Sequence, residues 1–251
     1  MPFIDRKTHQ LFIKTRGAGT PDFICLHGLV DSVSIWKRLA PALAERGRVT
    51  LVDQRGHGKS NAPAGHAERQ DLARDITATL DSLEIERAIL VGHSMGGIMA
   101  MATALMAPER VAGLVLIGTA SQCTEKVASW YERIAAAGER EGLPGIARMI
   151  YGKDSSKSII GDAPGMAAVT RTLGSLYTDP LTPRLSEIHC PALVIVGERD
   201  PMGPKASSII ADKLPNSTLE VVADCGHWVH VEQPDAVTAA IDRWQAARKV
   251  T

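Results

Sequence analysis

The chain has 251 residues, 45% of them hydrophobic, which suffices for one α/β domain or for one domain with an insertion. Lys plus Arg and Asp plus Glu each number 28 and are interspersed, which excludes a basic surface for nucleic acid or for anionic membrane. No apolar run has the about 18 to 20 residues of a membrane span, and the N-terminal segment lacks a signal-peptide stretch, so we expect a cytoplasmic protein.

The first part of the chain predicts alternating strands and helices. Residues 3–16 favour an antiparallel hairpin, and short apolar runs predict buried strands at residues 23–26, 49–52, 88–91 and 111–117. Between them we expect helices at residues 35–44, along an apolar stripe through Leu72, Ile76, Leu80 and Leu83, and at residues 98–105. This alternation indicates the α/β class, with a mostly parallel sheet covered by helices on both faces.

The alternation stops after Ile117. Residues 121–188 are helical in pattern, with breaks at residues 142–145, 162–165 and 178–180, and strands return only at residues 192–196 and 217–222. Helices are expected at residues 204–214 and from Pro234 onward. We therefore predict an α/β core made of residues 1–120 and 189–251, and a helical cap, residues 121–188, that lies over the site as a lid.

The segment Gly92-His93-Ser94-Met95-Gly96-Gly97 stands between the strand at 88–91 and the helix at 98–105. So sharp a turn forces Ser94 into a strained conformation, and a Cβ atom at position 92 or 96 would collide with the turn. A Gly-rich turn is the plainer interpretation of the motif alone. The flanking strand and helix favour a G-x-S-x-G nucleophile elbow, in which Ser94 is the nucleophile.

A serine nucleophile needs a base and an acid, which follow it as Asp or Glu and then His in this type of fold. Asp200 ends Gly197-Glu198-Arg199-Asp200, and His227 lies in Asp224-Cys225-Gly226-His227-Trp228, each directly after a predicted strand. Alone, Asp200 could be a turn residue and His227 an ordinary loop histidine. Together with Ser94 they predict a catalytic triad.

The rival acids fit less well. Asp224 is only three residues from His227, and Asp53 and Glu198 are less suitably placed. Glu232 is expected to face solvent at the start of the last helix.

A tetrahedral oxyanion needs two donors, for which we predict the backbone N–H groups of Met95 and Leu29. Trp130 and Trp228 are candidates for substrate contacts. For Trp130, as for its neighbour Tyr131, packing inside the cap is the competing interpretation.

No cofactor or metal is expected. Gly58-Lys59-Ser60 lacks the first glycine of a phosphate-binding loop, since Asp53 stands there, and Gly56-His57-Gly58 lacks the third glycine of a dinucleotide site. His27 and His57 are predicted to bond loop backbone. The four cysteines form no CxxC pair, and the eight histidines include no HExxH.

Along essentially its whole length the sequence resembles the α/β-hydrolase superfamily. The matching segments are His27-Gly28, residues 53–60, residues 92–97, residues 197–200 and Gly226-His227. Trp130, Arg133-Ile134 and Gly142 are similar to the cap of 3-oxoadipate enol-lactonases. His227-Trp228 resembles the C–C bond hydrolases of aromatic degradation, although those usually carry asparagine where this chain has His93.

The resemblance implies a serine hydrolase that cleaves small carboxylic esters or lactones. Ser94 in place of an aspartate excludes the haloalkane dehalogenase and epoxide hydrolase branches. The alternatives are a C–C bond hydrolase of vinylogous diketones, and a ligand receptor on the same fold with slow turnover. The expected partner is a small-molecule substrate; the sequence specifies neither that substrate nor the oligomeric state.

Overall fold

The computed structural model describes residues 2–63, 65–152 and 157–248, and is built on one eight-stranded sheet. The strands are β1 (Phe3–Asp5), β2 (Gln10–Arg16), β3 (Asp22–Leu26), β4 (Arg48–Val52), β5 (Ala88–His93), β6 (Val111–Ile117), β7 (Ala192–Gly197) and β8 (Ser217–Val222). Their order is β1-β2-β4-β3-β5-β6-β7-β8. β1 and β2 pair antiparallel, as does β2 with β4, and all other pairs are parallel. The predicted hairpin and mostly parallel sheet are confirmed.

Each central strand is buried on both faces. In β5, Leu90 belongs to one core cluster while Ile89 and Val91 belong to the other, as side chains that alternate across a strand require. Leu114 and Val115 of β6 divide in the same way. This two-sided burial explains why the strands appear in the sequence as continuous apolar runs.

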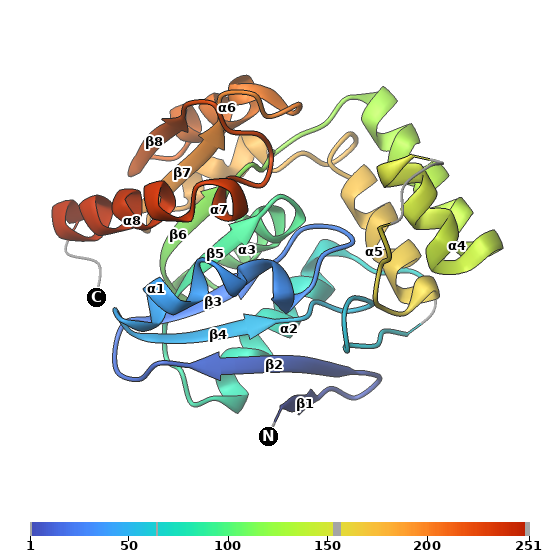
Figure 1. Ribbon diagram of the computed structural model, residues 1–251, viewed down its shortest axis with the longest axis horizontal. Coiled ribbons are helices and arrows are strands. Elements are labelled where there is room, and N and C mark those ends of the chain that lie inside the picture. The colour runs from blue at the N-terminus through green and yellow to red at the C-terminus, as the bar shows by residue number, and fades with distance from the viewer. Residues whose placement is uncertain (1, 64, 153–156, 249–251) are drawn as a thin grey trace.

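Helices cover both faces (Figure 1). One face packs against α2 (Arg69–Ser82), α3 (Met95–Met106), η3 (Thr182–Glu187) and α6 (Gly203–Lys213). The other packs against η1 (Val33–Lys37), α1 (Ala40–Ala44), α7 (Val229–Glu232) and α8 (Pro234–Arg248). A short helix, η2 (Pro108–Arg110), precedes β6. No helix among the described residues is long and apolar enough to cross a membrane.

The helix expected at residues 35–44 is two short helices instead, η1 and α1. Pro41 is in the first turn of α1 and has no N–H to continue a helix from upstream. The buried side chains of Trp36, Leu39 and Leu43 still form the predicted apolar face.

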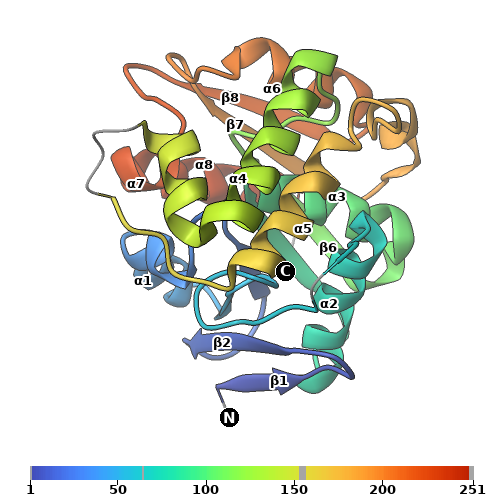
Figure 2. The same ribbon diagram turned by 90° about the vertical axis from the view of Figure 1, so that its right-hand side faces the viewer.

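Two helices form most of the predicted cap: α4 (Glu125–Tyr151) and α5 (Ala163–Gly174). They pack against each other and lie at the side of the sheet toward which β4 points (Figures 1 and 2). α4 is kinked at Gly142, where φ is 68°, within the predicted break at 142–145. We call residues 125–174 the α4–α5 insertion. The η3 helix belongs by its contacts to the core, because Leu185 packs in the main cluster beside Ile210 of α6.

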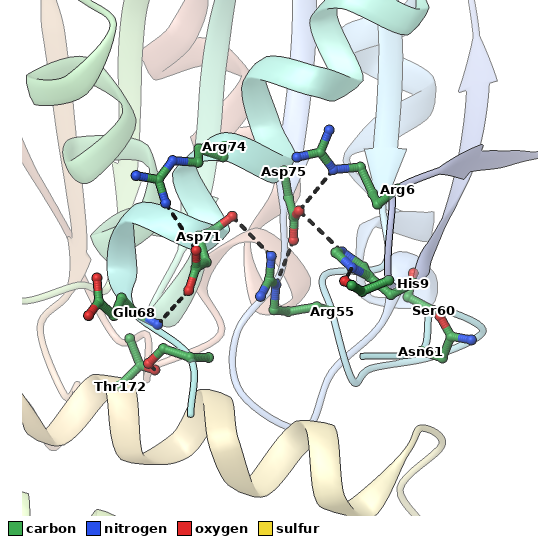
Figure 3. A network of polar contacts seen from close by, with 12 residues as sticks. Arg6, His9, Arg55, Ser60, Asn61, Glu68, Asp71, Arg74, Asp75 and Thr172 are labelled. Carbon is green, nitrogen blue, oxygen red and sulfur yellow. Dashed lines mark hydrogen bonds and ion pairs between the residues drawn. The ribbon is translucent and has the colours of Figure 1, made fainter. Parts of the chain in front are cut away.

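A buried ion-pair network, shown in Figure 3, fastens the hairpin and the β4–α2 loop to α2. The Asp75 carboxylate receives hydrogen bonds from Arg55 Nε at 2.6 Å and Arg6 Nε at 3.3 Å, and His9 Nε2 lies 3.1 Å away. Although burial raises the pKa of Asp75, its hydrogen bonds with His9 and Arg55 outweigh that effect and lower it. The network thereby holds the loop that follows β4 in place beside the carboxyl end of the sheet.

Candidate active site

Ser94 lies at the junction of β5 and α3 with φ 51° and ψ −115°, a strained conformation for a residue with a side chain. Its N–H donates to Ile117 O at 2.9 Å, and its carbonyl accepts a bond from Thr119 Oγ1 at 2.7 Å. The end of β6 thus holds the turn rigidly. The strain predicted from the sequence is present at the predicted residue.

The glycines beside Ser94 are required by close approach. A Cβ at Gly92 would lie 2.4 Å from Gly96 O, inside the turn itself, as predicted. A Cβ at Gly96 would instead meet Leu26 O of β3 at 2.0 Å. The expected collision at position 96 is therefore with the neighbouring strand. This contact brings the start of α3 against the loop that follows β3.

Asp200 and His227 come together across the ends of β7 and β8. Asp200 Oδ2 lies 2.9 Å from His227 Nδ1, and the Asp200 side chain is completely buried. Met202 N–H also donates to Asp200 Oδ1 at 2.8 Å, which orients the carboxylate. When His227 donates an Nδ1–H hydrogen bond to Asp200, its Nε2 is left with a free lone pair and can act as a base.

Gly118 makes room for this pair, a role that the sequence analysis missed. It follows β6 with φ 53°, and a Cβ there would lie 3.0 Å from Asp200 Oδ2 and 3.3 Å from His227 Nδ1. Ile117, which binds the Ser94 N–H, is the preceding residue. The end of β6 therefore adjoins both the elbow and the Asp200–His227 pair. A glycine directly after a buried strand was the available signal.

His93 links the elbow to the His227 loop. Its ring is 1% exposed, and Nε2 lies 3.1 Å from His227 O, to which a protonated Nε2 donates. Burial, and then the nearby rings of His230 and His227, lower the pKa of His93 well below its usual value. His93 is thus neutral at pH 7 and serves to hold the backbone of His227.

The two predicted oxyanion donors lie in adjoining segments. Met95 begins α3, and its side chain is buried in the main core cluster. Leu29 is in the loop after β3, the strand that pairs with β5. A Cβ at Gly28 would lie 2.9 Å from His93 Nδ1, so this loop packs directly on the elbow. The Leu29 side chain is half-buried against both the core and the α4–α5 insertion.

Trp228 and Trp130 occupy different surroundings. Trp228 packs edge-on against His227, with ring centroids 5.2 Å apart, and its Nε1 lies 3.4 Å from Asp31 Oδ2. Trp130 is half-buried in a cluster between the insertion and the loop after β3, beside Tyr131. Trp228 thus adjoins the site directly, whereas Trp130 belongs to the contact between the insertion and the core.

Two charged residues near His227 were not singled out from the sequence. Burial raises the pKa of Asp31 to about 6. Lys157 Nζ lies 5.8 Å from the centroid of the Trp228 ring and 4.8 Å from that of Tyr151. A cation from the insertion and a carboxylate from the loop after β3 therefore both lie beside the residue that follows His227.

The other candidate acids have different contacts. Asp53 is buried and accepts backbone bonds from Val33 and Lys59, and Asp224 is exposed with Arg199 as its partner. Glu198 accepts from the Asp224 N–H. Glu232 is exposed as expected and accepts from the Gly226 N–H, but it ends α7 and does not begin the last helix, α8.

The loop histidines bond backbone, as predicted. His27 Nδ1 lies 2.7 Å from Gly28 O and its Nε2 accepts from Gln54 N–H, while His57 Nδ1 lies 2.9 Å from Arg55 O. Their contacts fix the loops after β3 and β4.

The fold agrees with the comparison to known sequences. A sequence model described as the alpha/beta hydrolase fold matches residues 21–234. The chain belongs to the α/β-hydrolase fold family, which confirms the expected family and fold, and it is a hydrolase of that fold.

Among its relatives is 3-oxoadipate enol-lactonase 2 of Acinetobacter baylyi, 30% identical over 242 residues, which cover 90% of this chain and 88% of that one. A 2-hydroxy-6-oxononadienedioate/2-hydroxy-6-oxononatrienedioate hydrolase of Burkholderia vietnamiensis is 34% identical over 244 residues, covering 87% and 85%. A thermophilic esterase of Thermogutta terrifontis, a solved structure, superposes with a TM-score of 0.89 at 27% identity over 99% of both chains.

Proposed function

We propose that this hydrolase cleaves small carboxylic esters or lactones through an acyl-enzyme, with Ser94, His227 and Asp200 as its catalytic triad. The observation that carries the proposal is the 2.9 Å contact between the buried Asp200 carboxylate and His227, beside an elbow that holds Ser94 at φ 51°. An enol-lactonase and an esterase among the similar proteins support the substrate class.

In the first half-reaction, His227 Nε2 takes the Ser94 hydroxyl proton as Ser94 Oγ attacks the carbonyl carbon. The N–H groups of Leu29 and Met95 donate hydrogen bonds to the carbonyl oxygen as it becomes negatively charged. Asp200 stabilises the imidazolium, which then gives its proton to the leaving oxygen as the C–O bond breaks. In a lactone the leaving oxygen stays tethered to the acyl group.

In the second half-reaction, His227 takes a proton from water as the water attacks the acyl carbon. The imidazolium returns that proton to Ser94 Oγ, which leaves and releases the acid. The buried, neutral His93 holds the His227 backbone throughout, so that His227 reorients little between the two steps.

Wild-type protein should hydrolyse p-nitrophenyl acetate and incorporate one organofluorophosphonate group, at Ser94. Release of p-nitrophenolate measures the hydrolysis, and peptide mass spectrometry locates the covalent label. Wild type that neither turns over the ester nor labels at Ser94 contradicts the proposal. That result would instead favour a ligand receptor with slow turnover.

A C–C bond hydrolase of vinylogous diketones is the second candidate, because Trp228 follows His227 and Lys157 lies over the Trp228 ring. The similar protein from Burkholderia vietnamiensis is named for an oxo-dienedioate substrate, a doubly anionic compound that a cation beside His227 would favour. His93 at the position before the nucleophile weighs against this branch. Loss of absorbance from a yellow dienol-diketone at a kcat/KM above that for the esters would favour it.

A further inference from the structure

Val30 has an unusual backbone conformation. Its φ is 64°, and it directly follows Leu29. Asp31 N–H donates to Gly28 O at 3.3 Å, so residues 28–31 form a closed turn in which Val30 is the third residue. A positive φ at that place ordinarily selects Gly or Asn, because a β-branched side chain is strained there. The loop after β3 thus carries its strained residue one position after a proposed oxyanion donor.

The α4–α5 insertion packs on the apolar side of this turn. The Val30 side chain is 8% exposed and belongs to a cluster whose other buried members all come from the insertion: Ile134, Ile146, Ile159 and Met166. Leu29 packs against the same cluster. The insertion therefore contacts the turn through its strained residue, Val30.

The polar side of the turn is held by the catalytic loops. Asp31 Oδ2 lies 3.4 Å from Trp228 Nε1, which donates to it, and 3.8 Å from His93 Nδ1. A Cβ at Gly28 would lie 3.2 Å from Asp31 Oδ2, so the carboxylate is packed closely under the turn. The residues after His227 and before Ser94 thus meet at the side chain that ends the turn.

We propose that Val30 and Asp31 are positioning residues for the oxyanion hole. The insertion holds Val30, and the indole N–H of Trp228 holds Asp31, so that the strained turn between them directs the Leu29 N–H toward the oxyanion. Strained residues persist only where the surrounding structure over-determines them, and they gather at functional sites. The inference rests on the proposed function, and gives the insertion a second role: besides the covering role expected from the sequence, it sets the position of one of the donors.

Two variants of Val30 remove its contacts with the insertion while still allowing a positive φ at this position. Val30→Asn tolerates a positive φ but loses the apolar contacts, and Val30→Gly loses both the strain and the contacts. We expect kcat for p-nitrophenyl acetate to fall about tenfold to hundredfold in both, a part of the about 10² to 10³ that loss of a whole oxyanion donor costs. The Ki of a boronic acid, which forms a tetrahedral adduct on serine, should rise by the same factor. KM should change less than about twofold, a split that a merely structural role does not produce.

Two further positions complete the test. Ile146→Ala removes part of the packing of the insertion on Val30 without altering the residues of the turn, and should lower kcat in the same way. Combined with Val30→Asn, its effect on kcat should be less than additive. Glu84→Gly is the matched control, because Glu84 is an exposed residue with φ 54° in the turn after α2. That variant should leave kcat and the boronic acid Ki unchanged.

The outcomes distinguish the inference from the function on which it rests. The positioning role is overturned if Val30→Asn and Ile146→Ala melt cooperatively and keep kcat and the boronic acid Ki within about twofold of wild type. In that case the proposed function would still stand, provided that ester turnover depends on Ser94. Wild type without such turnover overturns the proposed function first. If the Val30 variants do not fold, Ile146→Ala alone decides, by the same split between kcat and KM.

Discussion

Asp200 Oδ2 lies 2.9 Å from His227 Nδ1, and the Asp200 side chain is completely buried. Asp200→Asn should therefore lower kcat by about 10⁴, since an amide no longer fixes the tautomer or stabilises the imidazolium. Steady-state ester hydrolysis measures this effect. Asp224→Asn is the control, because the Asp224 side chain is 84% exposed and bonded to Arg199. Reversed effects would move the acid to Asp224.

Ser94→Ala should abolish ester turnover, with a loss of about 10⁶ in kcat, the size found where a triad nucleophile is removed. Organofluorophosphonate labelling should vanish with it. Ser32→Ala tests whether loss of a nearby hydroxyl suffices, since Ser32 caps η1 in the segment after Asp31. We expect that variant to keep its activity and labelling. Turnover by Ser94→Ala within about tenfold of wild type would disprove the acyl-enzyme route.

Asp75→Asn should lower the free energy of unfolding by about 3 kcal/mol, because it leaves the buried Arg55 guanidinium without its carboxylate. Asp81→Asn on the same helix should cost less than about 1 kcal/mol, since the Asp81 side chain is 65% exposed and its partner Arg110 keeps hydrogen bonds to Ile85 O and Glu86 O. Urea unfolding at pH 7 measures both. Equal losses would show that the network does not hold the hairpin and the β4–α2 loop to α2.

Acid should destabilise the fold below about pH 6. Burial lowers the pKa of His27 to about 4 and of His230 to about 3, and burial together with His27 lowers that of His57 to about 3. Histidines in the unfolded chain bind protons near pH 6.5, while these three do not. As the pH decreases below that value, each of them therefore lowers the free energy of unfolding by up to about 1.4 kcal/mol per pH unit. Asp31, with its pKa raised to about 6, acts oppositely but is a single group.

His230→Phe tests this dependence. Neither ring nitrogen of His230 has a hydrogen-bond partner in the described structure, and its ring packs at a tilt against Trp36 with centroids 4.6 Å apart. The variant should lose less stability than wild type between pH 7 and pH 5, as measured by urea midpoints. His66→Phe, at an exposed position, should keep the wild-type dependence. No difference between the two variants would refute burial of a neutral His230 as the cause.

Lys157 should favour anionic substrates more than the cap arginines do, because its Nζ lies 5.8 Å from the centroid of the Trp228 ring, next to His227 in the chain. Arg171 is bonded to Glu132 and Glu139, Arg148 to Glu141, and Arg133 is exposed. Lys157→Ala should lower kcat/KM for a carboxylate-bearing lactone about fivefold relative to a neutral ester, the scale of a solvent-accessible ion pair. Arg133→Ala is the matched control and should change that ratio little. A ratio that falls with Arg133→Ala alone would assign carboxylate recognition to Arg133.

The sequence by itself determined the α/β class, the turn at Ser94, and the order in which Ser94, Asp200 and His227 follow one another along the chain. Parallel strands buried on both faces must be continuous apolar runs, and a strand that reverses into a helix at Ser94 needs glycines beside it. These are local requirements, so they can be recognised in neighbouring residues. Asp200 and His227 could be proposed because the carboxyl ends of parallel strands meet at one edge of the sheet.

Only the tertiary structure decided which residues support that chemistry. Gly118, His93 and Asp31 act through contacts with segments more than a hundred residues away, such as the His227–Trp228 loop, and no local pattern specifies those. The strain at Val30 is equally invisible in the sequence, because valine there contradicts the local preference of the turn. It persists because the insertion and the catalytic loops pack on the turn from two sides, which is a property of the assembled fold alone.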